Sequence, residues 1–530
     1  MSGARSTARS AALWLVLSVA ALLPFLLAAL PPLYDYYHWV FEGRLFSSLA
    51  FGSGGAVDEA IADAYGIRSV PVPNAAATVV LGLLNLALPP LIAGRVFAAC
   101  CALAFALGFA FLTRSIQRRP SVAELLGFPW AFAYFFYKGY LSYVLSVALS
   151  FVAIGALLRA SDGGRRAPRP LAIAALFAGS VVLFLCHLVG WAFLLASALL
   201  LALELARSDR RAAALLLAPF APSLILPLWY VLGGGGGRDS VYYASWGDKL
   251  RSLLEPWFLF VRTDPIPARF PVLGLSIGGL ALLAALVLAQ RGENPERLPA
   301  RPLLLLAALL GAAALLLPYN NFMGMNRPDG RIIYPAVLIG LASIPYRRVG
   351  GRGLLLATAT CLAILGLHAF EYAGASRYLE RVEAGLEASL PEEGPGVSLA
   401  VILPNRESGC GGPGRLSLGR SDTLRWFGLV PLMDSEGARV SLMATSLVEK
   451  HFDHDDFHDL KSVVVAPELI PELVLRSRDW ARHYTYVEIF GCPRDAERAS
   501  LALAPYFDVA GSGPGYAVLH PAAFPPESRD

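Results

Sequence analysis

The amino-acid sequence predicts an all-α polytopic membrane domain followed by a small soluble α/β domain. Of the 530 residues, 56% are hydrophobic and only 16% are charged, whereas soluble proteins carry about 25% charged residues. Apolar runs long enough to cross a bilayer, roughly 20 residues each, recur through residues 1–370. Residues 371–530 instead carry short apolar runs between glycine and proline turns, a pattern typical of strands. The runs with strand character are Val397–Leu403, Ser462–Ala466, Tyr484–Phe490 and Tyr516–Leu519.

Arginine clusters in the loops orient the predicted helices. Consecutive clusters leave room for two helices between them, at Arg114/Arg118/Arg119, Arg159/Arg165/Arg166/Arg169, Arg207/Arg210/Arg211, Arg291/Arg297/Arg301 and Arg347/Arg348/Arg352. Because positive loops face the cytoplasm, we place all of them inside. We predict eleven spans, at 11–30, 91–112, 121–137, 140–159, 170–187, 189–206, 212–232, 271–290, 302–318, 332–346 and 353–370. This multi-pass arrangement in the cell membrane puts the N-terminus in the cytoplasm and the C-terminal domain outside.

The first external loop, residues 32–90, carries an acidic residue and a histidine close to the first span. In a helix, Asp35, His38 and Glu42 are spaced i, i+3 and i+7, so they share one face. The tyrosines around them are typical of the membrane–water interface. Residues 75–88 are predicted to form an apolar helix in or near the outer leaflet. The simpler alternative is an interfacial helix whose polar residues only face water.

Other polar residues fall at predicted outer turns, namely Lys138, Tyr140, His187, Arg327, Asp329 and Arg331. Arginine binds phosphate bidentately and keeps its charge in a low dielectric, so Arg327 and Arg331 are candidate phosphate ligands. Simpler interpretations remain open for each of these residues. Lys138 could reach lipid headgroups, and His187 could cap an interfacial helix. Asp329 could bond its own backbone in a turn.

Two features of the predicted soluble domain could have a role beyond the fold. The run His451–Asp459 places His454 and His458 at i, i+4, a spacing that can hold a metal. It fits no known metal signature, so we assign no metal ligands. Cys410 and Cys492 are the only cysteines of the predicted outer domain, and an oxidising compartment would permit them to pair.

Composition also argues against two classes of function. The sequence has no basic patch interleaved with stacking aromatics on a soluble domain, so nucleic acid is not a predicted partner. None of the predicted spans carries an ionisable residue near its middle. Ion-coupled transporters usually place such groups near the bilayer midplane, so the pattern disfavours a transporter.

The layout resembles the GT-C superfamily of integral-membrane glycosyltransferases. The matching pieces are Asp35 after the first span, Tyr137-Lys138-Gly139-Tyr140 at the second external turn and Arg327-Pro328-Asp329-Gly330-Arg331 before a late span. The resemblance covers residues 11–370 and concerns layout more than motif. It implies an essential acidic residue in the first external loop and a polyprenyl-phosphate-linked sugar donor used on the outer side. Asp35 is followed by Tyr36 and Tyr37 and so lacks the Asp-Asp/Glu or Asp-x-Asp pair of several such families, which leaves the cofactor, including a divalent metal, unassigned.

We therefore predict a membrane glycosyltransferase that moves a sugar from a polyprenyl-phosphate donor to an unknown envelope acceptor. Displacing a phosphate from an anomeric carbon requires a base for the incoming hydroxyl and cations for the leaving group. Asp35 is the predicted base, with His38 and Glu42 as orienting groups, and the donor-binding residues are Lys138, Tyr140, His187, Arg327, Asp329 and Arg331. The alternatives are a non-catalytic scaffold that binds a lipid or an envelope partner, and a transporter.

Overall fold

The computed structural model describes most of the membrane domain and part of the C-terminal domain. The described residues are 2–52, 62, 65–162, 168–232, 243, 245–254, 257, 272–289, 300–318, 327–346, 351–389, 398–402, 448–450, 463–464, 470, 473, 481, 486–490, 493–513 and 516–522. Cys410, Cys492 and the His451–Asp459 run lie outside them, so their predicted pairing and metal spacing stay predictions.

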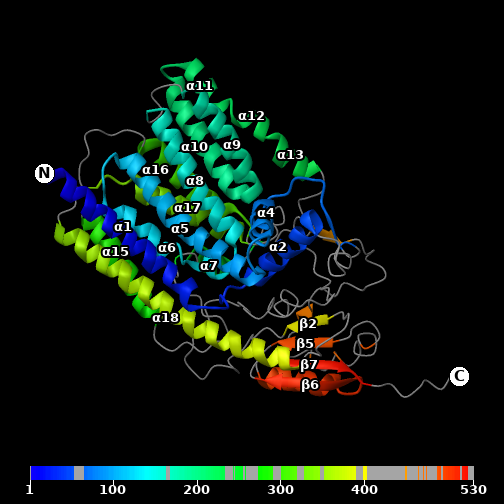
Figure 1. Cartoon of the computed structure of the whole chain (residues 1–530). Coiled ribbons are helices and arrows are strands. Elements are labelled where there is room, and N and C mark those ends of the chain that lie inside the picture. The colour runs from blue at the N-terminus through cyan, green and yellow to red at the C-terminus, as the bar shows by residue number, and fades with distance from the viewer. Residues whose placement is uncertain are drawn as a thin grey trace.

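Helices build the larger part of the molecule (Figure 1). They are α1 (Ser2–Leu27), α2 (Tyr36–Phe51), α4 (Ala75–Leu84), α5 (Pro90–Gln117), the 3₁₀ helix η1 (Val122–Leu126), α6 (Gly127–Trp130), α7 (Tyr134–Tyr137), α8 (Leu141–Ala160), α9 (Pro170–Cys186), α10 (Leu188–Ala206), α11 (Arg210–Leu217), α12 (Phe220–Ser223), α13 (Ile225–Leu232), α14 (Trp246–Leu254), α15 (Val272–Ala289), α16 (Ala300–Leu316), α17 (Pro328–Ser343) and α18 (Gly351–Ser389). Each predicted span therefore overlaps helical structure.

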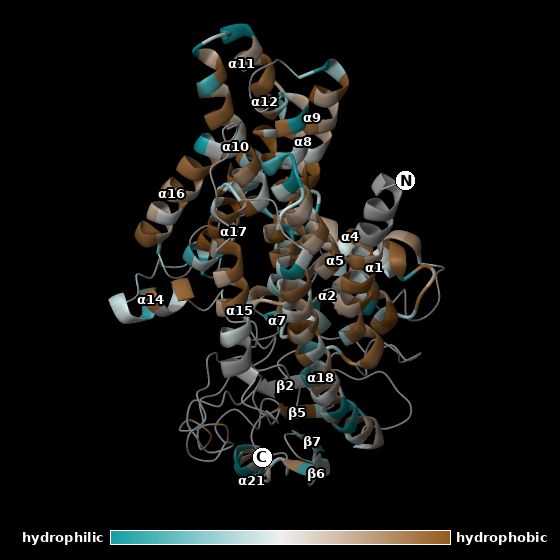
Figure 2. Cartoon of the chain, turned by 90° about the vertical axis from the view of Figure 1, so that its left-hand side faces the viewer, coloured by the Kyte–Doolittle hydropathy of each residue, from teal (hydrophilic) through white to brown (hydrophobic). Residues whose placement is uncertain are grey.

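Five segments among the described residues are long and apolar enough to cross a bilayer. They are Pro90–Gln117, Leu141–Ala160, Leu188–Ala206, Arg210–Leu232 and Gly351–Leu386. Shorter apolar helices fill most of the other predicted spans. Hydrophobic residues cover the helices of the bundle, whereas the far end of α18 and the C-terminal helix α21 (Pro493–Leu503) are hydrophilic (Figure 2). The apolar helical membrane domain is thus present, and the number of eleven crossings stays a prediction.

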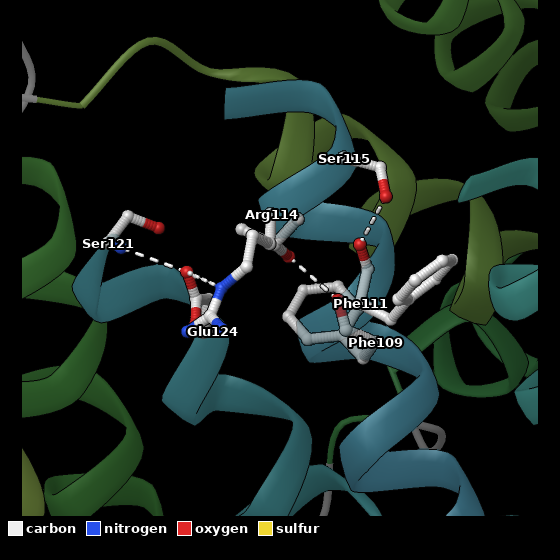
Figure 3. A network of polar contacts seen from close by, with 7 residues as sticks. Phe109, Phe111, Arg114, Ser115, Ser121 and Glu124 are labelled. Carbon is white, nitrogen blue, oxygen red and sulfur yellow. Dashed lines mark hydrogen bonds and ion pairs between the residues drawn. The ribbon is translucent and has the colours of Figure 1, made fainter. Parts of the chain in front are cut away.

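The predicted span 121–137 differs from a regular helix. It consists of η1, α6 and α7 in succession, and its side chains are buried inside the bundle. Pro129 contributes to the break because its ring lacks an N–H and clashes with the carbonyl four residues earlier. A capping box of Ser121 and Glu124 starts η1, and Glu124 also pairs with Arg114 at 2.7 Å. Figure 3 shows the Glu124 carboxylate between the Ser121 backbone and the Arg114 guanidinium.

Long helices connect two opposite ends of the bundle. At the end that we call the arginine end, Arg159 Nε donates to Ser115 Oγ over 2.9 Å. There Gln117 Nε2 also donates to the carbonyls of Ala342 and Ile344, each over 2.7 Å. These contacts gather the last turns of α5, α8 and α17.

At the other end, which we call the Asp35 end, the same three helices begin. The Tyr36 hydroxyl donates to the Leu91 carbonyl over 2.9 Å at the start of α5. The Tyr143 hydroxyl, in the first turn of α8, donates to the Arg331 carbonyl in the first turn of α17 over 2.7 Å. Among the described residues, Arg159 and the last turns of α5, α8 and α17 therefore lie at the opposite end from Asp35 and Arg331. Which end faces the cytoplasm stays a prediction.

The C-terminal part contains the predicted strands in one mixed sheet. Its order is β4-β2-β5-β7-β6, with β2 (Ser398–Ile402), β4 (Val463–Val464), β5 (Tyr486–Phe490), β6 (Phe507–Gly513) and β7 (Tyr516–Pro521). β2 runs parallel to β4 and β5, and β7 runs antiparallel to β5 and β6. Helix α21 packs on the sheet and buries Ala499 and Leu503 against Val487 and Leu519.

Two connections attach the C-terminal part to the membrane domain. The predicted domain boundary at residue 370 falls inside α18, which continues to Ser389 and packs against β6 and β7 (Figure 1). Strand β1 (Tyr65–Ile67) of the first predicted external loop pairs antiparallel with β3 (Val448–Lys450). The first loop and the C-terminal domain are therefore in direct contact.

Candidate functional site

A short backbone ladder joins the first predicted external loop to the second. The amide of Tyr34 donates to the Tyr137 carbonyl over 3.0 Å, and the amide of Asp35 donates to the Lys138 carbonyl over 3.1 Å. Gly139 permits this close approach because its φ is +70°, and a Cβ there would lie 2.5 Å from the Asp35 nitrogen. The ladder brings Asp35 and Lys138 together, although they are far apart in the sequence.

Helix α2 begins directly after Asp35, which occupies its N-cap position. The Trp39 indole donates to the Gly139 carbonyl over 3.0 Å and so fixes the first turn against the second loop. His38 is half-buried and its ring lies edge-on to Trp39. Glu42 is fully buried two turns along the helix. The helical spacing predicted for Asp35, His38 and Glu42 is therefore present, with Asp35 at the cap instead of inside the helix.

Tyr140 lies where the candidate acid and the candidate arginines approach one another. It was predicted to begin a span, but in the structure α8 and its spanning segment begin one residue later, at Leu141. Burial raises the pKa of the Tyr140 hydroxyl and the Asp35 charge raises it further. The charges of Arg331 and Arg327, and a hydrogen bond from Arg331, act in the opposite direction. The Arg331 guanidinium lies over the Tyr140 ring, and the backbone ladder holds Asp35 beside Lys138, two residues before Tyr140.

Arg331 is held by aromatic rings and by His187. Its guanidinium carbon lies 4.3 Å from the centre of the Tyr140 ring and 5.6 Å from that of Tyr143. Its Nη1 lies 2.7 Å from His187 Nε2. A guanidinium can only donate, so Nε2 accepts. The side chain is buried, with its orientation set from several sides.

His187 forms the turn between α9 and α10. Its Nδ1 lies 3.1 Å from the amide of Val189, so both ring nitrogens face donors. Burial lowers the pKa of His187 well below its usual value, and the Arg331 charge lowers it further. A neutral ring accepts at one nitrogen only. Nδ1 accepts from the Val189 amide and the Arg331 guanidinium can only donate to Nε2, so a single neutral tautomer satisfies one of these two contacts.

Two further cations flank the ring of Tyr134. Lys138 Nζ lies 4.6 Å from the centre of the Tyr34 ring and 5.7 Å from that of Tyr134. Arg327 Nη1 donates to the Tyr134 hydroxyl over 2.8 Å, and its guanidinium carbon lies 5.2 Å from the same ring. Lys138 is buried and Arg327 is half-buried. Aromatic faces attract cations, so these rings help to hold positive charge at this end of the bundle.

Asp329 takes a different position from its arginine neighbours. Its Oδ2 lies 3.0 Å from Lys249 Nζ of α14, and both side chains are buried. Its Oδ1 accepts from the Ser252 hydroxyl over 2.8 Å and from the Gly330 amide over 2.7 Å. The bond to the neighbouring amide is the turn contact that the simpler interpretation of this run anticipates. Its contacts with Lys249 and Ser252 tie Asp329 to α14.

The structure thus gathers Asp35, Lys138, Tyr140, His187, Arg327 and Arg331 into one set of linked contacts, which we call the cationic cluster. His38 and Glu42 follow Asp35 along α2, and Asp329 faces Lys249. Sequence reasoning missed Tyr134, Tyr143 and Lys249. The aromatic run from Tyr134 to Tyr137 was a signal for the first of these. In the described part of the chain, no three His, Cys, Asp or Glu side chains lie together as a metal site.

These features define an α-helical membrane protein with several spanning helices and a polar cluster at one end of its bundle. No protein-family model and no curated protein matches the chain. Among solved structures it is similar to the cryo-EM structure of arabinofuranosyltransferase AftD from Mycobacteria, with 14% identity and a TM-score of 0.44. The match covers 96% of this chain and 40% of AftD, so the chain spans about two-fifths of that protein's length. A likeness this weak does not define a substrate or a reaction.

Proposed function

We propose that this protein is a membrane glycosyltransferase. It would move a sugar from a polyprenyl-phosphate donor to an envelope acceptor on the outer side of the membrane. The observation that carries the proposal is that the backbone ladder holds Asp35 beside Lys138, next to the tyrosine rings over which Arg327 and Arg331 lie. A phosphate is the anion that two arginines and a lysine suit best.

Each residue has a chemical role in this proposal. Asp35 accepts the proton of the acceptor hydroxyl as its oxygen bonds to the anomeric carbon. The bond between that carbon and the phosphate oxygen breaks, and the polyprenyl phosphate leaves with the electron pair. Arg331, Arg327 and Lys138 stabilise the charge that grows on the leaving phosphate. Neutral His187 holds the Arg331 guanidinium through the 2.7 Å contact without adding a charge of its own.

The test uses the purified full chain in proteoliposomes with a panel of polyprenyl-phosphate-linked sugars, and measures release of polyprenyl phosphate together with binding. The proposal predicts turnover with at least one donor and loss of turnover in the variant Arg331→Ala. A non-catalytic scaffold would bind polyprenyl phosphate without consuming any donor. Binding without turnover across the whole panel, with envelope acceptors present, would contradict the enzyme and favour the scaffold.

A further inference from the structure

Helix α14 presents three different faces around its axis. At 3.6 residues per turn, successive residues are about 100° apart. Lys249 and Ser252 then share one face, and Trp246, Leu250 and Leu254 form a second, neighbouring face. Asp248 lies nearly opposite Leu250. The helix is therefore apolar on one side and polar on the other, with a third side between them that is available for docking.

The docking face of α14 is fixed to the start of α17. Lys249 Nζ pairs with the Asp329 carboxylate at 3.0 Å and also donates to the Leu317 carbonyl just beyond α16. The Ser252 hydroxyl donates to Asp329 over 2.8 Å. If Lys249 moved away from Asp329, the fully buried Asp329 carboxylate would lose its ion-pair partner, which is strongly unfavourable. The position of α14 is therefore coupled to the turn that carries Arg327 and Arg331.

The apolar face of α14 is exposed. Trp246, Leu250 and Leu254 have 80%, 60% and 50% of their surface accessible. The exposed end of α16 is near this helix, because Lys249 contacts the residue that directly follows Leu316, itself 80% exposed. Figure 2 shows α14 lying below α16 and across the long direction of the bundle.

We propose that α14 lies in the membrane interface at the Asp35 end and inserts Trp246, Leu250 and Leu254 at the boundary between headgroups and acyl chains. Asp248 points to water on the opposite side. An amphipathic helix with tryptophan on its apolar face is suited to that position. A stripe of three side chains is far smaller than the roughly 20–30 residues per side that a stable protein interface uses.

The insertion links the lipid surface to the cationic cluster. With its apolar face in lipid and Lys249 on Asp329, α14 holds the first turn of α17 at a fixed depth. Arg327 and Arg331 then stay at the level of the headgroups, where the phosphate of any membrane lipid lies. This inference depends on the membrane location of the bundle and does not require the proposed transfer reaction.

The test measures the depth of nitroxide labels on the full chain in proteoliposomes, after the native cysteines are replaced by serine. Leu250→Cys places a label on the apolar face, and Asp248→Cys is the matched control on the same helix. We expect the label at 250 to be accessible to oxygen and shielded from a water-soluble nickel chelate, and the label at 248 to show the reverse. Leu254→Cys should behave like Leu250→Cys, which gives a second position if one variant fails to fold.

Two results would overturn the proposal. Equal nickel accessibility at 250, 254 and 248 would mean that the helix lies in water. Shielding of 250 and 254 from both oxygen and nickel would mean that protein covers the stripe. Each variant should retain the thermal unfolding midpoint of the cysteine-free parent, because all of these side chains are exposed.

Discussion

Replacing Gly139 by alanine should open the ladder that holds Asp35 beside Lys138. At φ +70° an alanine costs roughly 1–2 kcal/mol. Its Cβ would lie 2.5 Å from the Asp35 nitrogen, and because a backbone atom cannot rotate away, the two segments must separate. That movement threatens the bonds of Tyr34 to Tyr137 and of Asp35 to Lys138, worth about 0.5–1.5 kcal/mol each. The expected loss of stability is therefore about 2–5 kcal/mol.

The assay is thermal or denaturant unfolding of the purified protein in mild detergent, followed by polyprenyl phosphate binding on the fraction that stays folded. Gly179→Ala is the matched control, since a Cβ there meets nothing within 4 Å. In the interior of α9 this control should leave stability unchanged or raise it by up to about 1 kcal/mol. If Gly139→Ala unfolds at the same midpoint as Gly179→Ala and binds equally well, the ladder does not position the site.

Three further predictions concern the phosphate ligands, the orientation and the pH dependence. Arg327→Lys and Arg331→Lys keep the charge but lose the planar guanidinium fork. The affinity for polyprenyl phosphate should therefore fall about tenfold or more, because one such contact is worth roughly 1.5–3 kcal/mol. Unchanged affinity in both variants would mean that this segment is only a turn and does not bind phosphate. A cysteine in place of Ser408 should be labelled from outside intact cells, whereas a cysteine in place of Ser208 should not. Labelling at position 208 would show that the predicted orientation is wrong. Because the pKa of His187 is lowered in the folded protein, only the unfolded chain binds a proton at this residue near pH 6.5. The free energy of unfolding should therefore fall by up to about 1.4 kcal/mol per pH unit below that value. His187→Gln should remove this pH dependence, and an unaltered pH profile of stability in the variant would contradict the prediction.

Much of the helix arrangement could be predicted, because the arginine clusters in the loops and the lengths of the apolar runs together indicate which polar residues lie at the same end of the bundle. Asp35, Lys138, His187 and Arg331 come from four separate turns, and alternation of the helices alone placed them together. The strands of the C-terminal domain were equally visible as short apolar runs. Among the described residues of this domain, strands β3 and β6 were missed, the first because it has three residues only, and the second because alanine, glycine and serine fill much of the strand from Phe507 to Gly513.

Other features depended on contacts that no local pattern carries. The pairing of Asp329 with Lys249 joins two different loops, and nothing near either residue in the sequence indicates the other. Hydropathy suggested a regular span at 121–137 because buried and lipid-facing apolar residues give the same signal. Likewise, the apolar run ends near residue 370, but the helix continues to Ser389 as an amphipathic segment that packs on the sheet.

The most direct measurement is donor turnover by Asp35→Asn, with polyprenyl phosphate binding measured on the same preparation. Asparagine is as good as aspartate at a helix N-cap, so α2 should form normally while the base is lost. Turnover should fall about 10²–10⁴-fold, or roughly 3–5 kcal/mol of barrier, with binding retained. Asp162→Asn is the control, because Asp162 pairs with Arg118 on the surface at the arginine end and asparagine tolerates its positive φ. Near-normal turnover in Asp35→Asn would contradict the proposed mechanism.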